Sequence, residues 1–293
     1  MMTAERAPKA QKEKKASPVS SFIPSEKTRA LLRAAFDEDF GRGDLTSELV
    51  VSKTAVATAK IFAREPGIFC GAPALLEIFK CADPALRAEF PVKEGAKFRK
   101  NTVVLILEGP VQSILRAERT ALNLLGHLSG IATMTRAFVD AVKGYPVLIL
   151  DTRKTMPLWR ELEKYAVRAG GGRNHRMGLY DAVFVKENHR PYGDLKKLSG
   201  FKGSVEIEVR NREELREAVK LHPRVILFDN FPPFRLKQVV QIARRLAPET
   251  ILEASGGITL ENVGHYAAMG VDWISVGALT HSVRSLDFSL LLK

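Results

Sequence analysis

Short apolar runs alternate with helical stretches in the second half of the chain, after Lys143. Each run is rich in β-branched or apolar residues, and six of them can be counted: 147–150, 182–185, 205–207, 225–228, 251–254 and 273–276. Such alternation is typical of βα units that build a parallel sheet. Because a closed (β/α)₈ barrel needs eight strands, we expect an α/β protein with a six-stranded open barrel; a doubly wound sheet is the alternative.

The first half of the chain has a mixed pattern. Strand-like runs at 57–63 and 103–107 flank a short apolar helix at 74–79, which predicts a small α/β unit. A long helical region follows at 111–142. We expect it to break near Gly126 and at Ser129-Gly130, where Ser129 can cap a new helix.

The chain is basic, with a formal net charge of +12 over 293 residues. Residues 1–20 supply +3 of that charge, from five bases and two acids, and their composition predicts a disordered tail. No run approaches the roughly 18 apolar residues that a membrane span requires, so we expect a cytoplasmic protein without a membrane partner. The two cysteines, Cys70 and Cys81, indicate neither a disulfide framework nor a zinc site.

Polar residues stand where the six runs end. The runs terminate in, or lead directly into, Asp151, Lys186, Glu208, Asp229, Ser255 and Gly277. The carboxyl ends of parallel strands converge on the active site in βα architectures. One charged end is most often an ordinary solvated charge, but polar residues at nearly every end predict a site.

Cations dominate the predicted site. The strand ends and their loops bring Arg153, Lys154, His175, Arg176 and Lys186 to face the carboxylates of Glu208 and Asp229. Such a ring suits substrates with several carboxylates or phosphates, because Arg binds them bidentately and Lys acts as a point charge. Glycines at 255–258 and 276–279 let backbone N–H groups approach a phosphate after the last two strands.

A protein nucleophile is not apparent. No serine lies in a nucleophile elbow, no cysteine has a poised histidine, and no histidines have metal-ligand spacing. We therefore expect catalysis by positioning and electrostatic stabilisation. The two carboxylates can either hold Mg²⁺ on a diphosphate or steady a developing positive charge.

Several strings, taken in order, carry a family resemblance that runs from about Ser25 to the C-terminus. They are Glu38-Asp39, Gly43-Asp-Leu-Thr-Ser47, Arg116-Ala-Glu-Arg-Thr-Ala-Leu-Asn123, Leu128-Ser-Gly-Ile-Ala-Thr133, Asp151-Thr-Arg-Lys-Thr155, Gly170-Gly-Gly-Arg-Asn-His-Arg176, Lys186-Glu-Asn-His189, Glu206-Ile-Glu-Val209 and Glu253-Ala-Ser-Gly-Gly-Ile258. Together they resemble quinolinate phosphoribosyltransferase. This resemblance implies transfer of a phosphoribosyl group from phosphoribosyl pyrophosphate to quinolinate, with decarboxylation to nicotinate mononucleotide.

The resemblance also implies a domain plan and a dimer. We expect a basic tail at 1–24, an N-terminal α/β sandwich domain at 25–130 with 284–293 as a candidate addition, and the barrel at 131–283. Active sites are expected at the interface between one chain's barrel and the other chain's N-terminal domain. Assembly beyond the homodimer is left open.

Site roles follow from the resemblance. The quinolinate carboxylates are assigned to Arg153, His175, Arg176 and the partner chain's own copy of Arg119. Catalysis and phosphoribosyl pyrophosphate binding are assigned to Lys154, Lys186, Glu208 and Asp229, the last two also holding Mg²⁺ directly or indirectly. The remaining phosphoribosyl pyrophosphate contacts are Ser255, Gly256, Gly257, Gly277, Ala278 and His281.

Two departures from the family pattern flank the pocket. Met156-Pro157-Leu158-Trp159 stands where the family usually has Thr-Pro-Gly and a smaller apolar residue, so Leu158 occupies a glycine position. The stretch between His189 and Ser204 is shorter than the family pattern. Both bear on the fit of the substrate.

Two other functions compete with this interpretation. A phosphoribosyltransferase of the same fold that acts on nicotinate or another aromatic acid needs fewer cations than the four proposed around quinolinate. A nucleic-acid-binding protein also fits the basic charge, but the sequence has no helix-turn-helix, aromatic RNP stretch or zinc-finger spacing. We therefore expect no nucleic-acid partner.

Overall fold

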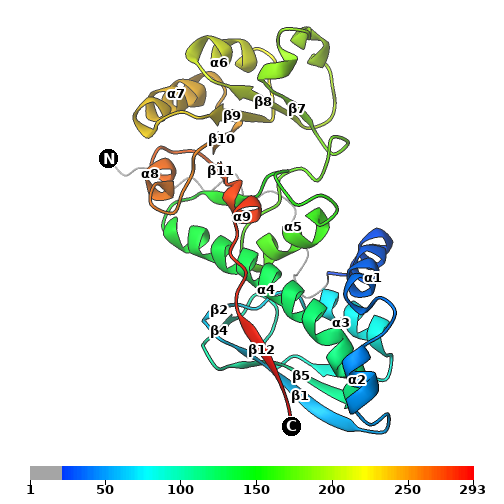
Figure 1. Cartoon of the computed structure of the whole chain (residues 1–293). Helices are drawn as coiled ribbons and strands as arrows, with labels where there is room; N and C mark the ends of the chain where they lie inside the picture. The colour runs from blue at the N-terminus through cyan, green and yellow to red at the C-terminus, as the bar shows by residue number, and fades with distance from the viewer. Residues whose placement is uncertain (1–21) are drawn as a thin grey trace. The chain divides into compact units, whose positions relative to one another are not determined.

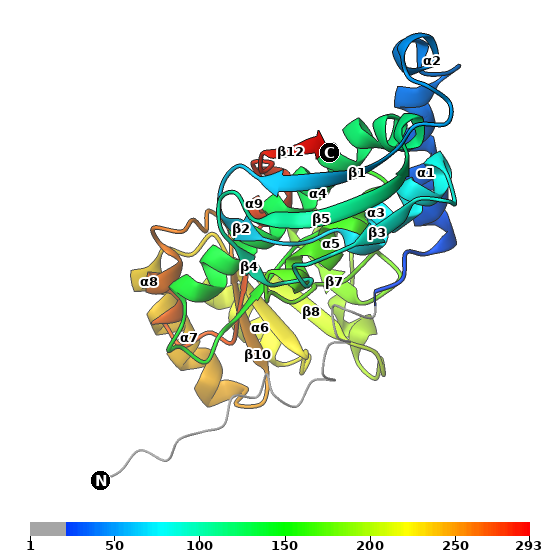
Figure 2. The same cartoon turned by 90° about the horizontal axis from the view of Figure 1, so that it is seen from below.

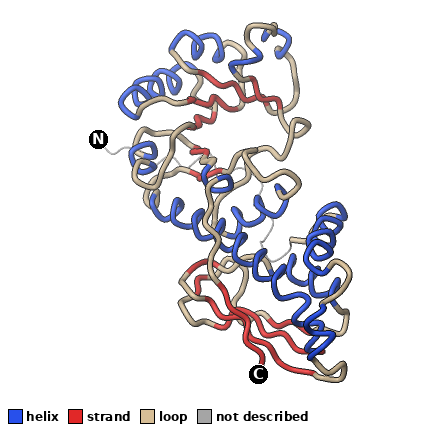
Figure 3. The backbone as a smooth tube through the Cα atoms, viewed as in Figure 1, coloured by secondary structure: helices blue, strands red, loops and turns tan. Residues whose placement is uncertain are grey.

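The computed structural model describes residues 22–293, which form two compact units (Figure 1). The N-terminal unit contains residues 22–136, Thr155–Gly171 and Leu279–Lys293, and the barrel unit contains Ala137–Lys154 and Gly172–Ala278. Each unit has its own sheet (Figure 3). Most of the predicted tail, 1–21, lies outside the described residues. Its last part packs on the body: Phe22 stacks on Tyr165 with ring centroids 4.1 Å apart, and Pro24 is buried.

The barrel unit contains one parallel sheet of six strands in the order β6-β11-β10-β9-β8-β7. The strands are β6 (Leu148–Leu150), β7 (Val183–Val185), β8 (Val205–Val209), β9 (Val225–Asp229), β10 (Ile251–Ser255) and β11 (Trp273–Ser275). All six apolar runs predicted as strands form them, which confirms the six-stranded open α/β barrel. The barrel is open because the two edge strands, β6 and β7, do not pair with each other; among the strands formed by residues 22–293, β6 pairs only with β11, and β7 pairs only with β8.

Helices cover the outer face of this sheet. They are α6 (Arg212–Val219), α7 (Pro233–Leu246) and α8 (Val263–Ala267). Two 3₁₀ turns, η3 (Glu187–His189) and η4 (Leu195–Leu198), lie between β7 and β8 in place of a longer helix. Figure 1 shows α6 and α7 beside β8 and β9. Leu215 and Leu236 are fully buried on the inner faces of α6 and α7, against strands whose Ile207 and Ile226 are also fully buried. Apolar burial of this kind stabilises the packing of the helices on the sheet.

The N-terminal unit is built on a four-stranded antiparallel sheet in the order β12-β1-β5-β3. Its strands are β1 (Val56–Ala63), β3 (Arg87–Glu89), β5 (Val103–Pro110) and β12 (Phe288–Leu292), with a second small sheet of β2 (Gly67–Ile68) and β4 (Lys97–Phe98). Figure 2 shows these strands side by side across the helices. The C-terminal β12 pairs with β1, opposing Leu290 to Ile61, so the end of the chain returns to the N-terminal sheet.

The helices of this unit are α1 (Glu26–Phe40), α2 (Leu45–Val50), α3 (Ala72–Ala82), α5 (Arg160–Ala169) and most of α4 (Val111–Ala141). Ser25 caps α1 by accepting the N–H of Thr28 at 3.2 Å. None of the helices formed by residues 22–293 is long and apolar enough to cross a membrane.

Helix α4 is continuous, so the predicted break near Gly126 and Ser129-Gly130 is wrong. The two glycines admit the C-terminal segment instead. A Cβ on Gly126 would lie 2.6 Å from the carbonyl oxygen of Leu286, and one on Gly130 would collide with the carbonyl oxygen of Arg284. Ser129 does not start a helix; its hydroxyl bonds to the N–H and the carbonyl of Cys70, each at 3.2 Å.

Candidate active site

The carboxyl edge of the barrel sheet collects the predicted polar residues. Glu208 lies within β8, Asp229 and Ser255 end β9 and β10, and Asp151 and Lys186 directly follow β6 and β7. The strands are parallel and in register, since Ser255 opposes both Asp229 and Ser275. Parallel register therefore brings side chains far apart in the sequence to one edge.

Asp151 fixes the loop that carries the predicted quinolinate contacts. Its side chain is fully buried, and it accepts the N–H of His175 at 2.8 Å and the side-chain amide of Asn174 at 2.5 Å. The segment before His175 also runs along β6, because Arg173 and Leu150 form a parallel bridge. The loop is therefore anchored to the sheet edge and His175 and Arg176 are held there.

Aromatic contacts hold two of the cations. The Arg176 guanidinium lies 4.9 Å from the centroid of the Phe184 ring and donates to the carbonyl of Ala182 at 3.0 Å. Burial and the nearby Arg153 lower the pKa of Arg176. Lys186 Nζ lies 4.8 Å from the same ring and 3.9 Å from Glu208 Oε2. Cation–π contact allows two positive groups to lie side by side before an anion arrives.

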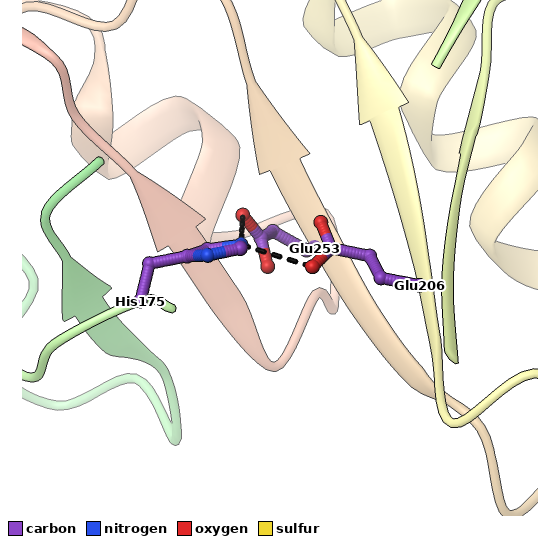
Figure 4. A group of neighbouring side chains, drawn as sticks. All are labelled: His175, Glu206 and Glu253. Carbon is purple, nitrogen blue, oxygen red and sulfur yellow. Dashed lines mark ion pairs between the residues drawn. The ribbon is translucent and has the colours of Figure 1, made fainter. Parts of the chain in front are cut away.

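His175 faces a buried pair of carboxylates that the sequence interpretation left without a role (Figure 4). Its Nε2 lies 3.0 Å from Glu206 Oε2 and 3.7 Å from Glu253 Oε1. Its Nδ1 accepts the backbone N–H of Arg176 at 2.8 Å. Because Nδ1 is the acceptor, the ring proton belongs on Nε2, facing the carboxylates, and this arrangement does not suit metal binding at Nε2.

The two glutamates lie inside the barrel. Glu206 is 4% exposed and Glu253 is 0% exposed, and the Ser275 hydroxyl donates to Glu253 at 2.5 Å. Burial, and then the neighbouring charge of Glu206, raise the pKa of Glu253 to about 8. One oxygen of each carboxylate, Glu206 Oε1 and Glu253 Oε2, is buried without a hydrogen-bond partner among residues 22–293.

A second acidic group lies at the ends of β8 and β9. Carboxylate oxygens of Glu187, Glu208 and Asp229 lie within 4.8 Å of one another. Burial, and then the charge of Asp229, raise the pKa of Glu208 to about 7. Oxygen ligands of this type are the ones Mg²⁺ takes in proteins. The donor set thus fits the predicted metal and adds Glu187 to Glu208 and Asp229.

The glycine loop after β10 has the backbone that only glycine adopts easily. Gly256 and Gly257 have φ values of +95° and +60°, and a Cβ on Gly256 would collide with the Asn230 side chain. Gly277 follows β11, and Ala278 begins the short helix α9 (Ala278–His281). His281 is exposed, with Nδ1 2.6 Å from the Ser282 hydroxyl, and it belongs to the N-terminal unit.

Arg119 also belongs to the N-terminal unit. It is exposed on α4 and lines a cavity of about 380 Å³. The same cavity is lined by Glu38 and Asp39 of α1, by Asn123 and His127 of α4, and by Met156 and Trp159. Part of the loop that departs from the family pattern therefore shares a cavity with Arg119.

The two departures have local structural consequences. Leu158 has a φ of +71° and is 80% exposed, so it adopts the left-handed conformation that a glycine would take without strain. Residues 190–203 form a short connection with the turn η4. In this connection Arg190 donates to the carbonyl of Glu208 at 3.0 Å and thereby holds the end of β8.

Three glutamates at this edge were missed as site residues. Glu206 and Glu253 stand two positions before Glu208 and Ser255 on their strands. Alternate strand residues face the same side, so period-two reasoning could have placed both glutamates inside with their neighbours. Glu187 gave no such signal, because its orientation depends on the 3₁₀ turn that follows β7.

Comparison with known proteins agrees with the fold. Residues 44–129 match the N-terminal domain of quinolinate phosphoribosyl transferase, and residues 131–291 match its C-terminal domain. The chain is 43% identical over 271 residues to a protein of Bacillus subtilis (strain 168) named probable nicotinate-nucleotide pyrophosphorylase [carboxylating], with 89% of this chain and 92% of that protein covered. A nicotinate-nucleotide pyrophosphorylase [carboxylating] of Mycobacterium leprae (strain TN) is 42% identical over 274 residues, with 89% of this chain and 96% of that protein covered.

A solved structure is similar over nearly the whole length. The nicotinate-nucleotide pyrophosphorylase from Francisella tularensis superposes with a TM-score of 0.87 at 36% identity, covering 95% of this chain and all of that one. The two domain matches together span most of the chain. The chain therefore belongs to the quinolinate phosphoribosyltransferase family.

Proposed function

We propose that the carboxyl edge of the barrel sheet is where this chain binds quinolinate and phosphoribosyl pyrophosphate. The chain is a pentosyltransferase: it transfers the phosphoribosyl group to quinolinate with decarboxylation, in NAD synthesis. The observation that supports this site most is the placement of Arg176, Lys186 and Glu208 together at one sheet edge. Cations and carboxylates in one place suit a reaction between two anions at a sugar carbon.

Quinolinate carries two adjacent carboxylates, and the loops after β6 supply cations for them. Arg153 and Arg176 offer planar guanidinium forks that bind carboxylates bidentately. His175 lies beside them on the loop that Asp151 anchors. Arg119 would complete the grip from a second chain. A site with this many cations favours a dicarboxylate over nicotinate.

Phosphoribosyl pyrophosphate would lie along β8 to β11. Glu208 and Asp229 would bind the ribose hydroxyls. With Glu187, whose carboxylate lies close to theirs, they would hold Mg²⁺, which would neutralise charge on the diphosphate. The 5-phosphate would bind the glycine loops that follow β10 and β11, at Ser255, Gly256, Gly257, Gly277 and Ala278. His281 stays a predicted phosphate contact. Positive φ at Gly256 and Gly257 lets the backbone approach the phosphate.

The residues of the chain would act by positioning and electrostatics. Lys154 and Lys186 would stabilise the negative charge that grows on pyrophosphate as its bond to the sugar breaks. The sugar carbon becomes oxocarbenium-like, and the pyridine nitrogen attacks it. Loss of CO₂ then leaves an electron pair on the ring carbon next to the positive nitrogen, which stabilises it until that carbon takes a proton from solvent. Glu208 and Asp229 at the sheet edge would stabilise the positive charge that develops on the sugar carbon.

We infer a homodimer in which each active site takes its barrel from one chain and Arg119 from the other. In the N-terminal unit, Arg119 lines a cavity that also contains Glu38 and Asp39, so this surface is polar and hollowed. The cytoplasmic location expected from the sequence and any assembly beyond the dimer stay predictions.

An assay of product formation tests the proposed function. Purified protein with quinolinate, phosphoribosyl pyrophosphate and Mg²⁺ should form nicotinate mononucleotide, pyrophosphate and CO₂, and nicotinate should replace quinolinate poorly. Removing Mg²⁺ with a chelator should stop turnover, and adding Mg²⁺ back should restore it. Equal turnover of nicotinate would favour the competing substrate, and undiminished turnover with chelator would remove Mg²⁺ from the proposal.

A further inference from the structure

We propose that Glu206 and Glu253 are positioning residues that hold the His175 ring and, through it, Arg176 in place to bind quinolinate. The inference rests on the proposed function, because it deepens the quinolinate site. Glu206 and Glu253 are buried carboxylates that are not among the predicted substrate contacts.

The first step is the grip on His175. Glu206 Oε2 lies 3.0 Å and Glu253 Oε1 lies 3.7 Å from Nε2, and the His175 side chain is only 10% exposed. Glu206 comes from β8 and Glu253 from β10, so the ring is held from two strands (Figure 4). The Ser275 hydroxyl on β11 fixes Glu253 in turn. Three strands therefore determine the plane of one ring.

The second step passes from the ring to Arg176. Nδ1 accepts the Arg176 N–H at 2.8 Å, so the ring's orientation sets the Arg176 backbone. The guanidinium is held separately, by the carbonyl of Ala182 and the face of Phe184. If the ring turns, the backbone loses its acceptor while the guanidinium stays tethered. Quinolinate would then meet a strained or displaced cation.

Burial of Glu206 and Glu253 has a cost to stability that their contact with His175 accounts for. Ionisable groups in a low-dielectric interior cost free energy, so a buried pair with one unsatisfied oxygen each weakens the fold. A role in holding His175 accounts for that arrangement, as in other sites where outer groups orient the residues that contact a ligand.

Amide variants of His175 separate its two contacts, the one from Nε2 to the glutamates and the one from Nδ1 to the Arg176 N–H. Asn at position 175 can place an amide oxygen near Nδ1 and keep the acceptor for Arg176, but it cannot reach the glutamates. Gln can place an amide N–H near Nε2 and keep the contact to Glu206, but it loses the acceptor. We expect His175→Gln to raise the KM for quinolinate more than His175→Asn does, and neither to change the KM for phosphoribosyl pyrophosphate more than about twofold.

A double-mutant cycle tests whether Glu206 acts through His175. Glu206→Gln alone should raise the KM for quinolinate about five- to tenfold, with a smaller effect on kcat. In the His175→Asn background, Glu206→Gln should change the KM for quinolinate less than twofold. Glu94→Gln is the control, because Glu94 is a half-buried, hydrogen-bonded glutamate of the N-terminal unit; it should leave both KM values unchanged.

An ¹⁵N spectrum of labelled histidines gives a reading without activity. The chain has only six histidines, and the His175→Asn variant assigns the His175 signals. Wild type should show a protonated Nε2 and an acceptor Nδ1 at position 175, and Glu206→Gln should shift both. An unshifted signal, or an equal KM effect of Glu206→Gln in both backgrounds, would overturn the proposal. If the wild-type protein does not turn over quinolinate, the proposed function is wrong. The ¹⁵N signals would still test whether Glu206 holds His175, because they do not depend on turnover.

Discussion

Leu158 shows how a single residue can carry a conformational cost in a loop whose neighbours Met156 and Trp159 line the Arg119 cavity. Its φ of +71° is one that glycine adopts freely, and it is 80% exposed, so the side chain gains little from burial. The family pattern had marked this position as one where a glycine was replaced. The structure confirms that the backbone there is left-handed.

Leu158→Gly should raise the free energy of unfolding by about 0.5 to 1 kcal/mol. Relief of the left-handed strain stabilises the folded state by about 1 to 2 kcal/mol. The greater entropy of glycine in the unfolded chain offsets about 0.5 to 1 kcal/mol of this. Urea unfolding measures the difference. Leu158→Ala keeps the strained backbone and is the control. If the Ala and Gly variants are equally stable, the conformation of residue 158 is not strained.

Glu94 links stability to pH at the residue scale. Its Oε1 accepts the N–H groups of Gly71 at 2.9 Å and Ala72 at 2.6 Å, and so caps α3, but burial raises its pKa above the ordinary value of 4.5. A raised acid pKa means that the folded state holds the proton more tightly. The stability linked to that proton is complete below pH 4.5 and is lost as the pH rises through the folded pKa.

The free energy of unfolding of Glu94→Gln should therefore increase relative to that of wild type as the pH rises from 4 to 8. The glutamine keeps an oxygen for the two N–H groups and has no charge to bury. Urea unfolding at a series of pH values measures the difference between the two proteins. A difference that stays constant, or that favours wild type more at high pH, would show that Glu94 is not costly when ionised.

At the scale of elements, the strands of the barrel could be predicted and the long helix only in part. Each strand is an apolar run of its own, so local pattern was enough. The glycines of α4 looked like breaks because their reason lies in the C-terminal segment, whose backbone passes against Gly126 and Gly130. A contact between segments so far apart in the chain leaves no local pattern.

Gly130→Ala should cost about 1 to 3 kcal/mol of stability, because the new methyl group collides with the backbone at Arg284. Helix propensity alone predicts the opposite sign, a gain of about 1 kcal/mol. Gly264→Ala in α8 is the matched control, since its Cβ would lie 4.0 Å from its nearest neighbour, the Ala141 carbonyl. Thermal melts should show a loss for the first and no loss for the second. Gly130→Ala as stable as wild type would mean that the C-terminal segment is not packed against α4.

At the scale of the whole molecule, motif and strand-end placement together predicted the sheet edge that gathers Lys186, Glu208 and Asp229. The period-two pattern could have placed Glu206 and Glu253 on the side of Glu208 and Ser255, but their contact with His175 depends on the folded barrel and could not be predicted. A shared site between two chains cannot be derived from one chain's pattern either. The proposed shared site would depend on Arg119, which lies in the unit that does not contain the barrel sheet.

Mixed dimers test the shared site most directly. Arg119→Ala and Lys154→Ala should each be nearly inactive alone. In a mixed dimer, one site collects both defects and the other receives intact Arg119 and Lys154 from different chains. Random reassociation makes about half the dimers mixed, so turnover should recover to roughly a quarter of wild type under C₂ symmetry. If mass spectrometry confirms exchange of subunits and turnover stays at the level of the single variants, Arg119 does not serve the partner's barrel and the shared site is wrong.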